Sequence, residues 1–470
     1  MIWLPLLPTL VLTAGALGLL LAEAFRRPGS AAGVAWGALG VTTLGLGATG
    51  ALAGQGPIEG IQRMVLWDHV AFWLSLTILV GTWIAVLLSW RYLADQGIER
   101  GEYYVFLLLA AAGMLLMTVA ADLLIVFLAL EWLSFPLYVL AGFARPRLES
   151  EEAALKYFLL GAFASAFLVF GIALILAGTG LTNLNDLAAW LRHPDPATQP
   201  LVWMGGALLL VALGFKVAAV PFHLWTPDVY EGAPTPVTAF MAAATKTAAV
   251  AALIRVFLIG MGPAMDLWAG PIAVIAAATM LVGNGAALMQ SNFKRMMAYS
   301  SIAHAGYLLM GLLGDPSLAL PGVMFYLLAY ATATLGAFAV AVGMASPAQE
   351  DQSFGAYAGV AQQAPGMGAA MVVFMLSLIG VPPTAGFFAK LALFAAAWQA
   401  GWIALVLIGV ITTVISAYFY LRVVVAMWMG RPEPARLPLP YPGVRASVVL
   451  SGAGTLLLGI LWLMLRGFSL

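Results

Sequence analysis

Apolar runs long enough to cross a lipid bilayer recur along the whole chain, and they restrict its fold more than any other feature. A transmembrane helix needs about 20 apolar residues, and the sequence offers about fourteen such runs. Hydrophobic residues make up 63% of the 470 residues and charged residues only 9%, which excludes a water-soluble fold. The sequence therefore predicts an all-α polytopic membrane protein. The expected spans are 2–22, 33–54, 69–90, 103–120, 122–143, 152–178, 201–222, 236–260, 267–289, 296–314, 319–345, 366–398, 401–428 and 446–466.

Basic residues are distributed unequally between the connections, and this predicts the orientation. Connections after even-numbered spans hold only Arg63, Arg192 and, at a span end, Arg255. By the positive-inside rule the connections after odd-numbered spans, which hold more basic residues, are cytoplasmic. We therefore expect both termini on the outer side of a bacterial inner membrane. The richer set, after odd-numbered spans, holds Arg26, Arg27, Arg91, Arg100, Arg145, Arg147, Lys294, Arg295, Arg431, Arg436 and Arg445.

Composition also limits the chemistry. The chain has no cysteine, which excludes disulfides and cysteine-held iron–sulfur clusters, and its four histidines are scattered, so we expect no metal site. The net charge is zero and gives no indication of nucleic acid. The run 2–22 has no basic residue before it, which favours a first span over a cleaved signal peptide.

Lysine lies inside the expected spans, whereas arginine lies at their ends. Lys216, Lys246 and Lys390 fall well inside apolar runs. A buried lysine can release its proton and arginine cannot, so this division indicates proton transfer. Lys216 lies five residues before Pro221, where the missing N–H should break the helix. Lys246 lies roughly 15 Å along a helix that starts near Pro236, which is close to the bilayer midplane.

The alternative for these lysines is snorkelling, in which the side chain reaches the headgroups from a span end. This alternative fits Lys294, which neighbours Arg295 at a helix start. It fits Lys156 about as well as a buried role does, because Glu152 lies four residues earlier and can pair with it on the helix surface.

Only one acidic residue is deep in an expected span. Glu131 lies roughly 13 Å along the fifth helix, and an ionised carboxylate there needs a partner, for which Lys216 and Lys246 are the candidates. A purely structural ion pair is the alternative. His223 follows the Pro221 break and is either a proton relay or a group that satisfies freed carbonyls. Residues in the following turn and before the fifth span are expected only to cap or brace: Asp122, Asp228 and Glu231.

The spacing of the lysines indicates an internal repeat. Lys216 and Lys390 both lie near proline breaks, and 390 − 216 = 174. Adding 174 to 131 gives 305, beside His304. We therefore expect two five-helix units, 103–260 and 261–430, flanked by an N-terminal three-helix segment, 1–102, and a last helix, 431–470. Five is odd, so the second unit enters the membrane inverted, as in many transporters with paired broken helices.

At these residues the chain resembles a known family, over essentially its whole length. It resembles the antiporter-like membrane subunits of respiratory complex I, and among them the subunit N family of bacterial NADH–quinone oxidoreductase. The resemblance is carried by the segments KVAAVPFHLWTPDVYEGAPTPVTAFMAAATK, ALKYFLLGAFASAF, KRMMAYSSIAHAGYLLMG and GVPPTAGFFAKL. The sibling subunit M typically has an acid in place of Lys390, and subunit L has a long lateral helix after its last span.

The resemblance implies a proton-translocating subunit without a redox centre of its own. It implies a pair between the residues matching Glu131 and Lys216, and a hydrophilic axis continued by Lys246 and Lys390, with Lys156 and His223 along it. NADH, FMN, iron–sulfur clusters and quinone are then expected in partner subunits of the membrane domain and the peripheral arm. The alternatives are a subunit of a multisubunit Na+/H+ antiporter or membrane-bound hydrogenase, and a stand-alone solute symporter.

Overall fold

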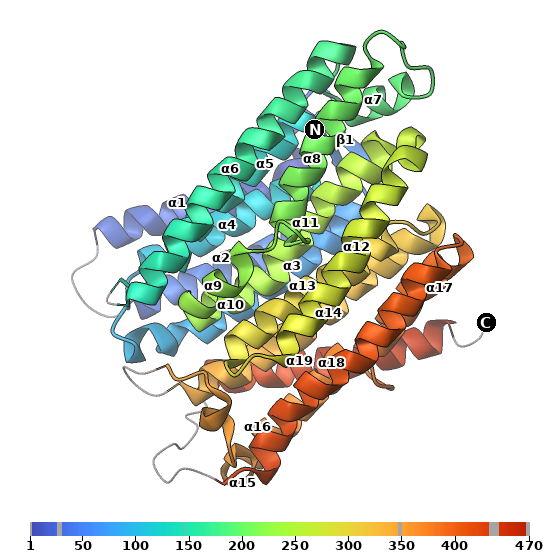
Figure 1. Cartoon of the computed structure of the whole chain (residues 1–470). Helices are drawn as coiled ribbons and strands as arrows, with labels where there is room; N and C mark the ends of the chain where they lie inside the picture. Colours follow the sequence, from blue (N-terminus) through green and yellow to red (C-terminus); the bar gives the residue numbers. More distant parts are fainter. Residues whose placement is uncertain (1, 26–30, 146, 346–349, 432–440, 467–470) are drawn as a thin grey trace.

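Every expected span coincides with a helix, or with a pair of helices, in the computed structural model (Figure 1). The structure describes residues 2–25, 31–145, 147–345, 350–431 and 441–466. Eleven helices in these ranges are long and apolar enough to cross a membrane. The remaining expected spans are shorter, broken or less apolar helices, so the prediction of an all-α polytopic membrane protein is confirmed.

The helices of the first half are η1 (Leu4–Leu6), α1 (Leu7–Ala24), α2 (Ala32–Ala51), α3 (His69–Asp95), α4 (Glu102–Thr118), α5 (Leu123–Ala141), α6 (Leu148–Thr179), α7 (Leu184–Trp190), α8 (Gln199–Val217), α9 (Trp225–Gly232), α10 (Thr235–Phe240), η2 (Met241–Thr245), α11 (Lys246–Leu253) and η3 (Ile254–Gly260). Those of the second half are η4 (Gly262–Ala264), α12 (Met265–Leu288), α13 (Phe293–Gly311), α14 (Pro316–Met344), η5 (Phe354–Tyr357), α15 (Val360–Gln363), α16 (Pro365–Ile379), α17 (Ala385–Gln399), α18 (Ile403–Met429) and α19 (Pro442–Arg466). One hairpin pairs β1 (Ile58–Gly60) with β2 (Val65–Trp67).

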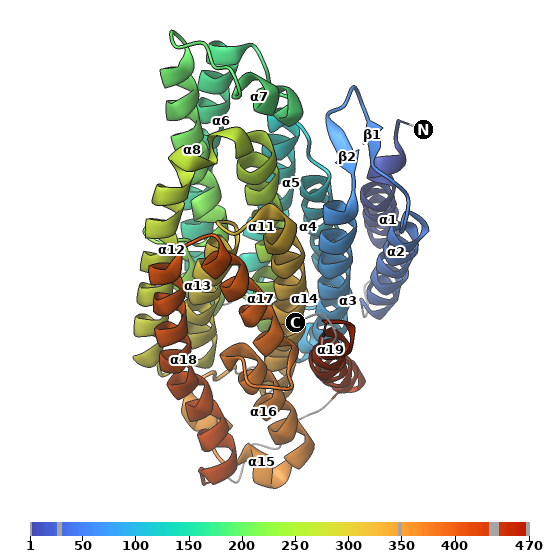
Figure 2. The same ribbon diagram turned by 90° about the vertical axis from the view of Figure 1, so that its right-hand side faces the viewer.

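The helices form one bundle with a buried middle layer. Figure 2 shows α6, α8, α12 and α18 along one side, α1 and α2 on the other, and α11, α13 and α14 between them. The helix from Thr235 to Gly260 and helix α14 are the most buried spans, whereas α6 and α19 bury only about a third of their residues. The inner helices therefore carry side chains that neither lipid nor bulk water reaches directly.

Both expected helix breaks are present. Helix α8 ends at Val217, and the helical path resumes only at α9. Helix α16 ends at Ile379, and α17 begins at Ala385. The residue after each half-helix is left-handed: Ala218 has φ +65° and Gly380 has φ +91°, a conformation that closes a helix C-terminus. The fold therefore contains the two broken helices that the prolines indicated.

Matching backbone hydrogen bonds relate the two halves. The Leu123 N–H donates to the Thr182 carbonyl (2.9 Å), and the Phe293 N–H donates to the Gln352 carbonyl (2.7 Å). Both partners are offset by 170 residues, since 293 − 123 = 170 and 352 − 182 = 170. These contacts lie beside α7 in the first half and just before α15 in the second, and Figure 1 shows α7 and α15 at opposite ends of the bundle. The related units are thus inverted.

The register of the repeat corrects the pairing expected from lysine spacing. At the breaks, the Ala219 N–H donates to the Gly214 carbonyl (2.8 Å) and the Val381 N–H to the Leu376 carbonyl (2.9 Å), an offset of 381 − 219 = 162. Lys216 precedes its break in α8, whereas Lys390 follows its break in α17. The spacing of 174 residues therefore does not make these two lysines equivalent positions.

Arg255 belongs to a span and not to a connection. It lies in the π-helical segment η3 with 1% of its surface exposed. Its guanidinium binds the Asp68 carboxylate at 2.6 and 2.8 Å and donates to the Thr118 carbonyl. The residue therefore ties the end of this span to the start of α3 and the end of α4. Of the other basic residues used for orientation, Arg26, Arg27 and Arg436 lie outside the described residues.

Candidate functional site: a line of buried lysines

Lys246 is a buried residue of the most enclosed span in the described part of the chain. The helix that carries it runs from Thr235 to Gly260 and contains two π-helical stretches, one of which ends immediately before Lys246. Such π-helical segments occur often at functional sites. Lys246 is 4% exposed, and its ammonium donates to the carbonyls of Ser301 (2.8 Å) and Val217 (3.4 Å). Lys246 therefore joins the broken end of α8 to helix α13.

Lys216 occupies the last turn of α8, directly before the break. Its Nζ donates to the Ser134 hydroxyl of α5 (2.7 Å) and the Tyr157 hydroxyl of α6 (3.2 Å), and lies 5.2 Å from the centre of the Tyr157 ring. The Tyr157 ring stacks on Trp225 of α9, whose indole N–H donates to the Phe215 carbonyl (3.0 Å). The break thus holds Lys216 against neutral hydroxyl groups and an aromatic face.

Glu131 is near Lys216 but does not bind it directly. In the described ranges no ion pair within 4.0 Å joins this carboxylate to a lysine; instead the Ser165 hydroxyl of α6 donates to it. Glu131 is close enough to interact electrostatically with Lys216. The expected direct pair is therefore not formed: Lys216 binds the hydroxyls of Ser134 and Tyr157, and Glu131, which is half-buried, binds that of Ser165.

Lys390 contacts the second break from the half-helix that follows it, α17. Its Nζ donates to the Ile379 carbonyl, the last of α16 (2.9 Å), and lies 4.8 Å from the centre of the Tyr307 ring. Lys246 binds the Val217 carbonyl, the last of α8, and 379 − 217 = 162 is the same offset as at the breaks. A positive charge at a helix C-terminus is favoured by the helix dipole. Lys390 and Lys246 therefore make the same kind of contact with the end of a broken helix, although they lie on helices that the repeat does not relate.

Both lysines contact α13, Lys246 at the Ser301 carbonyl and Lys390 at the Tyr307 ring, and polar side chains lie on this helix between the two contacts. Ser301, His304 and Tyr307 are spaced by three residues, so they share a helix face. The His304 ring binds the hydroxyls of Tyr326 (2.6 Å) and Tyr420 (3.1 Å). A cavity of about 10 Å³ between His304, Tyr330 and Lys390 has room for one water molecule. The position of His304, noted from the repeat arithmetic, is thus in the middle of this line.

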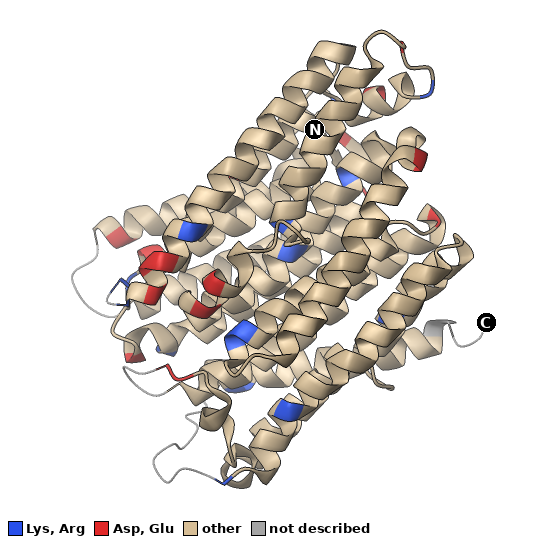
Figure 3. Cartoon of the chain, in the orientation of Figure 1, with Lys and Arg blue, Asp and Glu red and all other residues tan. Residues whose placement is uncertain are grey.

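Lys156 lies at the charged end of the bundle and not among the buried lysines. It binds Glu152 and Asp228, both at 2.6 Å, and 40% of its side chain is exposed. The expected pair with Glu152 is confirmed. Asp228 also binds Arg295 (2.8 Å), so it braces α9 against α6 and α13. Figure 3 shows the acidic residues of α6 and α9 gathered at this end, where a cavity of about 540 Å³ opens between them.

His223 lies in the first break and is half-buried. Its Nδ1 has no hydrogen-bond partner, and within the described part of the chain no hydrogen bond joins its ring to a lysine. The structure thus brings Lys216, Lys246 and Lys390 into one polar line, with Glu131 beside it, and leaves Lys156 and His223 at its margin.

Two functional candidates were missed or misread from the sequence. Lys294 is 2% exposed and donates to the Ala233 carbonyl (2.5 Å), so the expectation that it snorkels is wrong. Helical periodicity offered a signal, because Lys294 and Ser301 are seven residues apart and share a face of α13. Glu350 was not singled out, because it lies in a connection and its partners are distant in sequence.

An inverted repeat of helices, two broken helices and a line of buried lysines define an antiporter-like membrane subunit. The family described as NADH:quinone oxidoreductase/Mrp antiporter, TM matches residues 120–416, and the chain belongs to this family, in its NADH-quinone oxidoreductase subunit N branch. NADH-quinone oxidoreductase subunit N 1 of Herpetosiphon aurantiacus is 44% identical over 432 residues, which cover 90% of this chain and 88% of that protein.

Solved structures give the same fold. A chain of respiratory complex I from Thermus thermophilus with bound aureothin is 38% identical, has a TM-score of 0.83 and covers 97% of both chains. A chain of the Mrp complex from Dietzia sp. superposes with a TM-score of 0.86 at 22% identity, over 98% of this chain and 95% of that one. The second likeness, at that identity, concerns the fold alone.

Proposed function

We propose that this chain is a proton-translocating membrane subunit of a bacterial NADH–quinone oxidoreductase, and that Lys216, Lys246 and Lys390 hold and release the protons. The observation that carries the proposal is the set of partners of these lysines. Each buried ammonium is bound by hydroxyls, carbonyls or an aromatic face, and no carboxylate lies within 4.0 Å of it in the described residues. A buried ammonium without a counter-ion is costly to keep charged, so such a group can give up its proton.

The path then has a defined order. Glu131 acts on Lys216 through its charge, Lys216 and Lys246 meet at the broken end of α8, and α13 leads from Lys246 to Lys390. A shift that moves the Glu131 charge toward or away from Lys216 changes how firmly that lysine holds its proton. Lys156 and His223 stand at the margin, where protons can be exchanged with water. Electron transfer takes place in partner subunits that hold NADH, FMN, iron–sulfur clusters and quinone.

A neighbouring subunit covers the face formed by α5 and α6. Glu131 and Ser165 are both half-exposed there, at the depth of a transmembrane span. A carboxylate facing lipid at that depth is costly, so intramembrane acids lie against protein or water. This supports assembly with other membrane subunits.

We propose the same orientation in the membrane, and the same division of the chain into segments, that the sequence predicted. Arg147 and Arg295 line one cavity at one end of the bundle. Arg63 pairs with Asp186 of α7, away from this cavity. Assigning the former end to the cytoplasm leaves both termini outside the inner membrane. The segments are 1–102, the repeats 103–260 and 261–430, and 431–470.

The second candidate, a subunit of a sodium/proton antiporter complex, rests on the shared fold. The lower identity to the Mrp chain, 22% against 38% for the complex I chain, favours the oxidoreductase. A stand-alone symporter needs a substrate cavity in the membrane, and the large charged cavity lies at the end of α9 instead.

Purification through a tag on this chain tests the assignment. We expect a large assembly with flavin and iron–sulfur absorbance that reduces quinone with NADH. A matched preparation from untagged cells is the control for carry-over. Recovery of the tagged chain in an assembly that lacks flavin and catalyses sodium-dependent proton exchange would replace the proposal with the antiporter alternative.

A further inference from the structure

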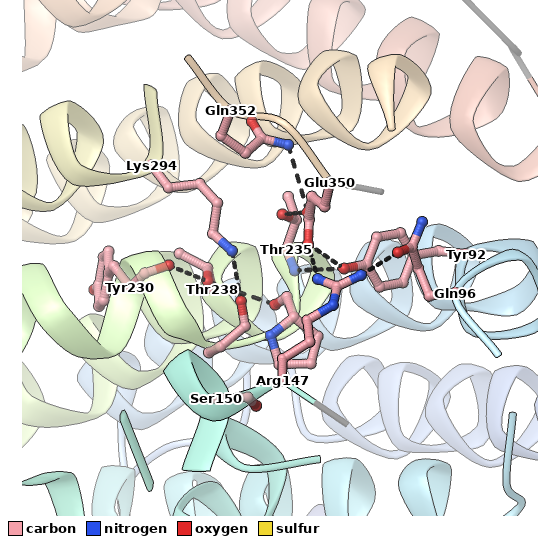
Figure 4. A network of polar contacts seen from close by, with 12 residues as sticks. Tyr92, Gln96, Arg147, Ser150, Tyr230, Thr235, Thr238, Lys294, Glu350 and Gln352 are labelled. Atoms are coloured by element: carbon pink, nitrogen blue, oxygen red, sulfur yellow. Dashed lines mark hydrogen bonds and ion pairs between the residues drawn. The ribbon is translucent and has the colours of Figure 1, made fainter. Parts of the chain in front are cut away.

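A buried carboxylate outside the lysine line holds three distant parts of the chain together. Glu350 follows α14, and its side chain is 3% exposed. It accepts hydrogen bonds from the Tyr92 hydroxyl of α3 (2.6 Å), from Arg147 in the connection before α6 (3.0 Å) and from the Thr235 hydroxyl (Figure 4). Residues of the N-terminal segment, the first repeat and the second repeat therefore meet on one carboxylate.

The surroundings keep Glu350 ionised. Burial raises the pKa of its carboxyl, but Lys294 and the hydrogen-bond donors around it outweigh this effect and hold the pKa below its usual value. The groups that face it are Tyr92 from α3, Arg147, Thr235 from α10, Lys294 from α13 and Gln352 on its own segment. At neutral pH Glu350 is therefore ionised and forms an ion pair with Arg147.

That charge lies at the start of the helix that carries Lys246. Thr235 is the first residue of α10; its N–H donates to the Tyr92 hydroxyl (3.3 Å) and its own hydroxyl to Glu350. The preceding Pro234 makes no side-chain cap. The first N–H groups of a helix lack internal partners, and a negative charge there is favourable. Tyr92 thus accepts the first N–H of the helix from a distant segment, and Glu350 holds both the Tyr92 and the Thr235 hydroxyls in place.

The connection before this helix is held from the second repeat as well. Lys294 of α13 donates to the Ala233 carbonyl, between α9 and α10 (2.5 Å). Glu350 and Lys294 therefore hold the joint between α9 and α10 on both of its sides. Neither contacts Lys246, which lies eleven residues further along the helix, roughly 16 Å at 1.5 Å per residue.

We infer that Glu350 is a positioning residue for Lys246, because from the second repeat it holds Thr235 and the Tyr92 hydroxyl that caps the helix start, and so sets the position of Lys246 along the helix axis against Val217 and Ser301. The inference rests on the proposed function of Lys246. A slip of one residue moves the ammonium about 1.5 Å along the axis and turns it by roughly a quarter of a turn, which breaks both carbonyl bonds. The second repeat therefore controls whether Lys246 stays in line with Lys216.

The test uses the assembled complex with Glu350→Gln, which keeps the hydrogen-bond acceptor and removes the charge. Asp351→Asn is the matched control, because it removes the exposed neighbouring charge. Thr235→Val removes the hydroxyl at the helix start, and Thr235→Ser keeps it. We expect amide exchange over 235–242 to be roughly fivefold faster in Glu350→Gln and Thr235→Val, as for the loss of a typical cap.

Turnover per flavin is measured on the same samples. We expect Glu350→Gln and Thr235→Val to lose about tenfold in coupled quinone reduction at an unchanged KM for quinone, and Glu350→Asp, Thr235→Ser and Asp351→Asn to keep most of it. Unchanged exchange and turnover in Glu350→Gln would overturn the inference. Should that variant not assemble, normal turnover in Thr235→Val would overturn it equally. Lys246→Met separates the two proposals, because its normal pumping would reject the proposed function itself.

Discussion

Replacing Lys216 with alanine is expected to lower proton pumping and coupled quinone reduction by about tenfold or more, while the complex still assembles. Lys216 lies directly before the break in α8 and is influenced by the Glu131 charge, so on the proposed path its loss removes the first group that holds and releases a proton. Lys216→Arg should fail as well, because guanidinium does not release its proton. Proton uptake by inverted membrane vesicles, with NADH-driven quinone reduction, measures both variants.

Arg192→Ala is the control, since it removes an exposed basic residue in a connection far from the line. It should pump normally. Full activity in Lys216→Arg would mean that a fixed positive charge is sufficient at this position, and Lys216 would then lose its role as a proton carrier.

Glu131→Gln is expected to reduce pumping nearly as severely as Lys216→Ala. Glutamine still accepts the hydrogen bond of Ser165, so the change removes the charge and leaves the local packing in place. Without that charge the hydrogen-bond partners of Lys216 in the described residues are the hydroxyls of Ser134 and Tyr157, which do not favour the protonated form as an anion does. Glu131→Asp should keep part of the activity at a shorter reach.

Asp122→Asn is the matched control for this acid. Asp122 is the buried N-cap of the same helix, accepting from the Leu124 N–H and the Thr182 hydroxyl, and an asparagine at this position can also cap. We expect it to be nearly silent, with assembly checked on a native gel. Greater damage from Asp122→Asn than from Glu131→Gln would contradict the assignment of the charge that acts on Lys216.

Features set by local physics were predictable from the sequence. The spans followed from hydrophobic length, and the breaks followed from prolines that cannot donate a hydrogen bond. These rules involve residues that are near one another in the chain. The observed helices and both breaks accordingly match the expectations closely.

Features set by contacts between distant segments were not predictable in the same way. The spacing of 174 residues mixes helices and connections of unequal length, so it concealed an offset of 170 at the helix starts and 162 at the breaks. The direct pair of Glu131 and Lys216 was expected from charge alone, but Ser134 and Tyr157 occupy the lysine. Glu350 gave no local signal, because its partners lie up to 258 residues away.

The central claim is that the buried lysines carry protons. Lys246→Met tests this claim most directly, because the unbranched methionine side chain resembles that of lysine but cannot be protonated. The measurement is the pH gradient formed by vesicles during NADH oxidation, normalised to the flavin content of the assembled complex. We predict that Lys246→Met forms little or no gradient while its complex assembles with normal flavin content. A gradient of normal size and rate in this variant would contradict the account.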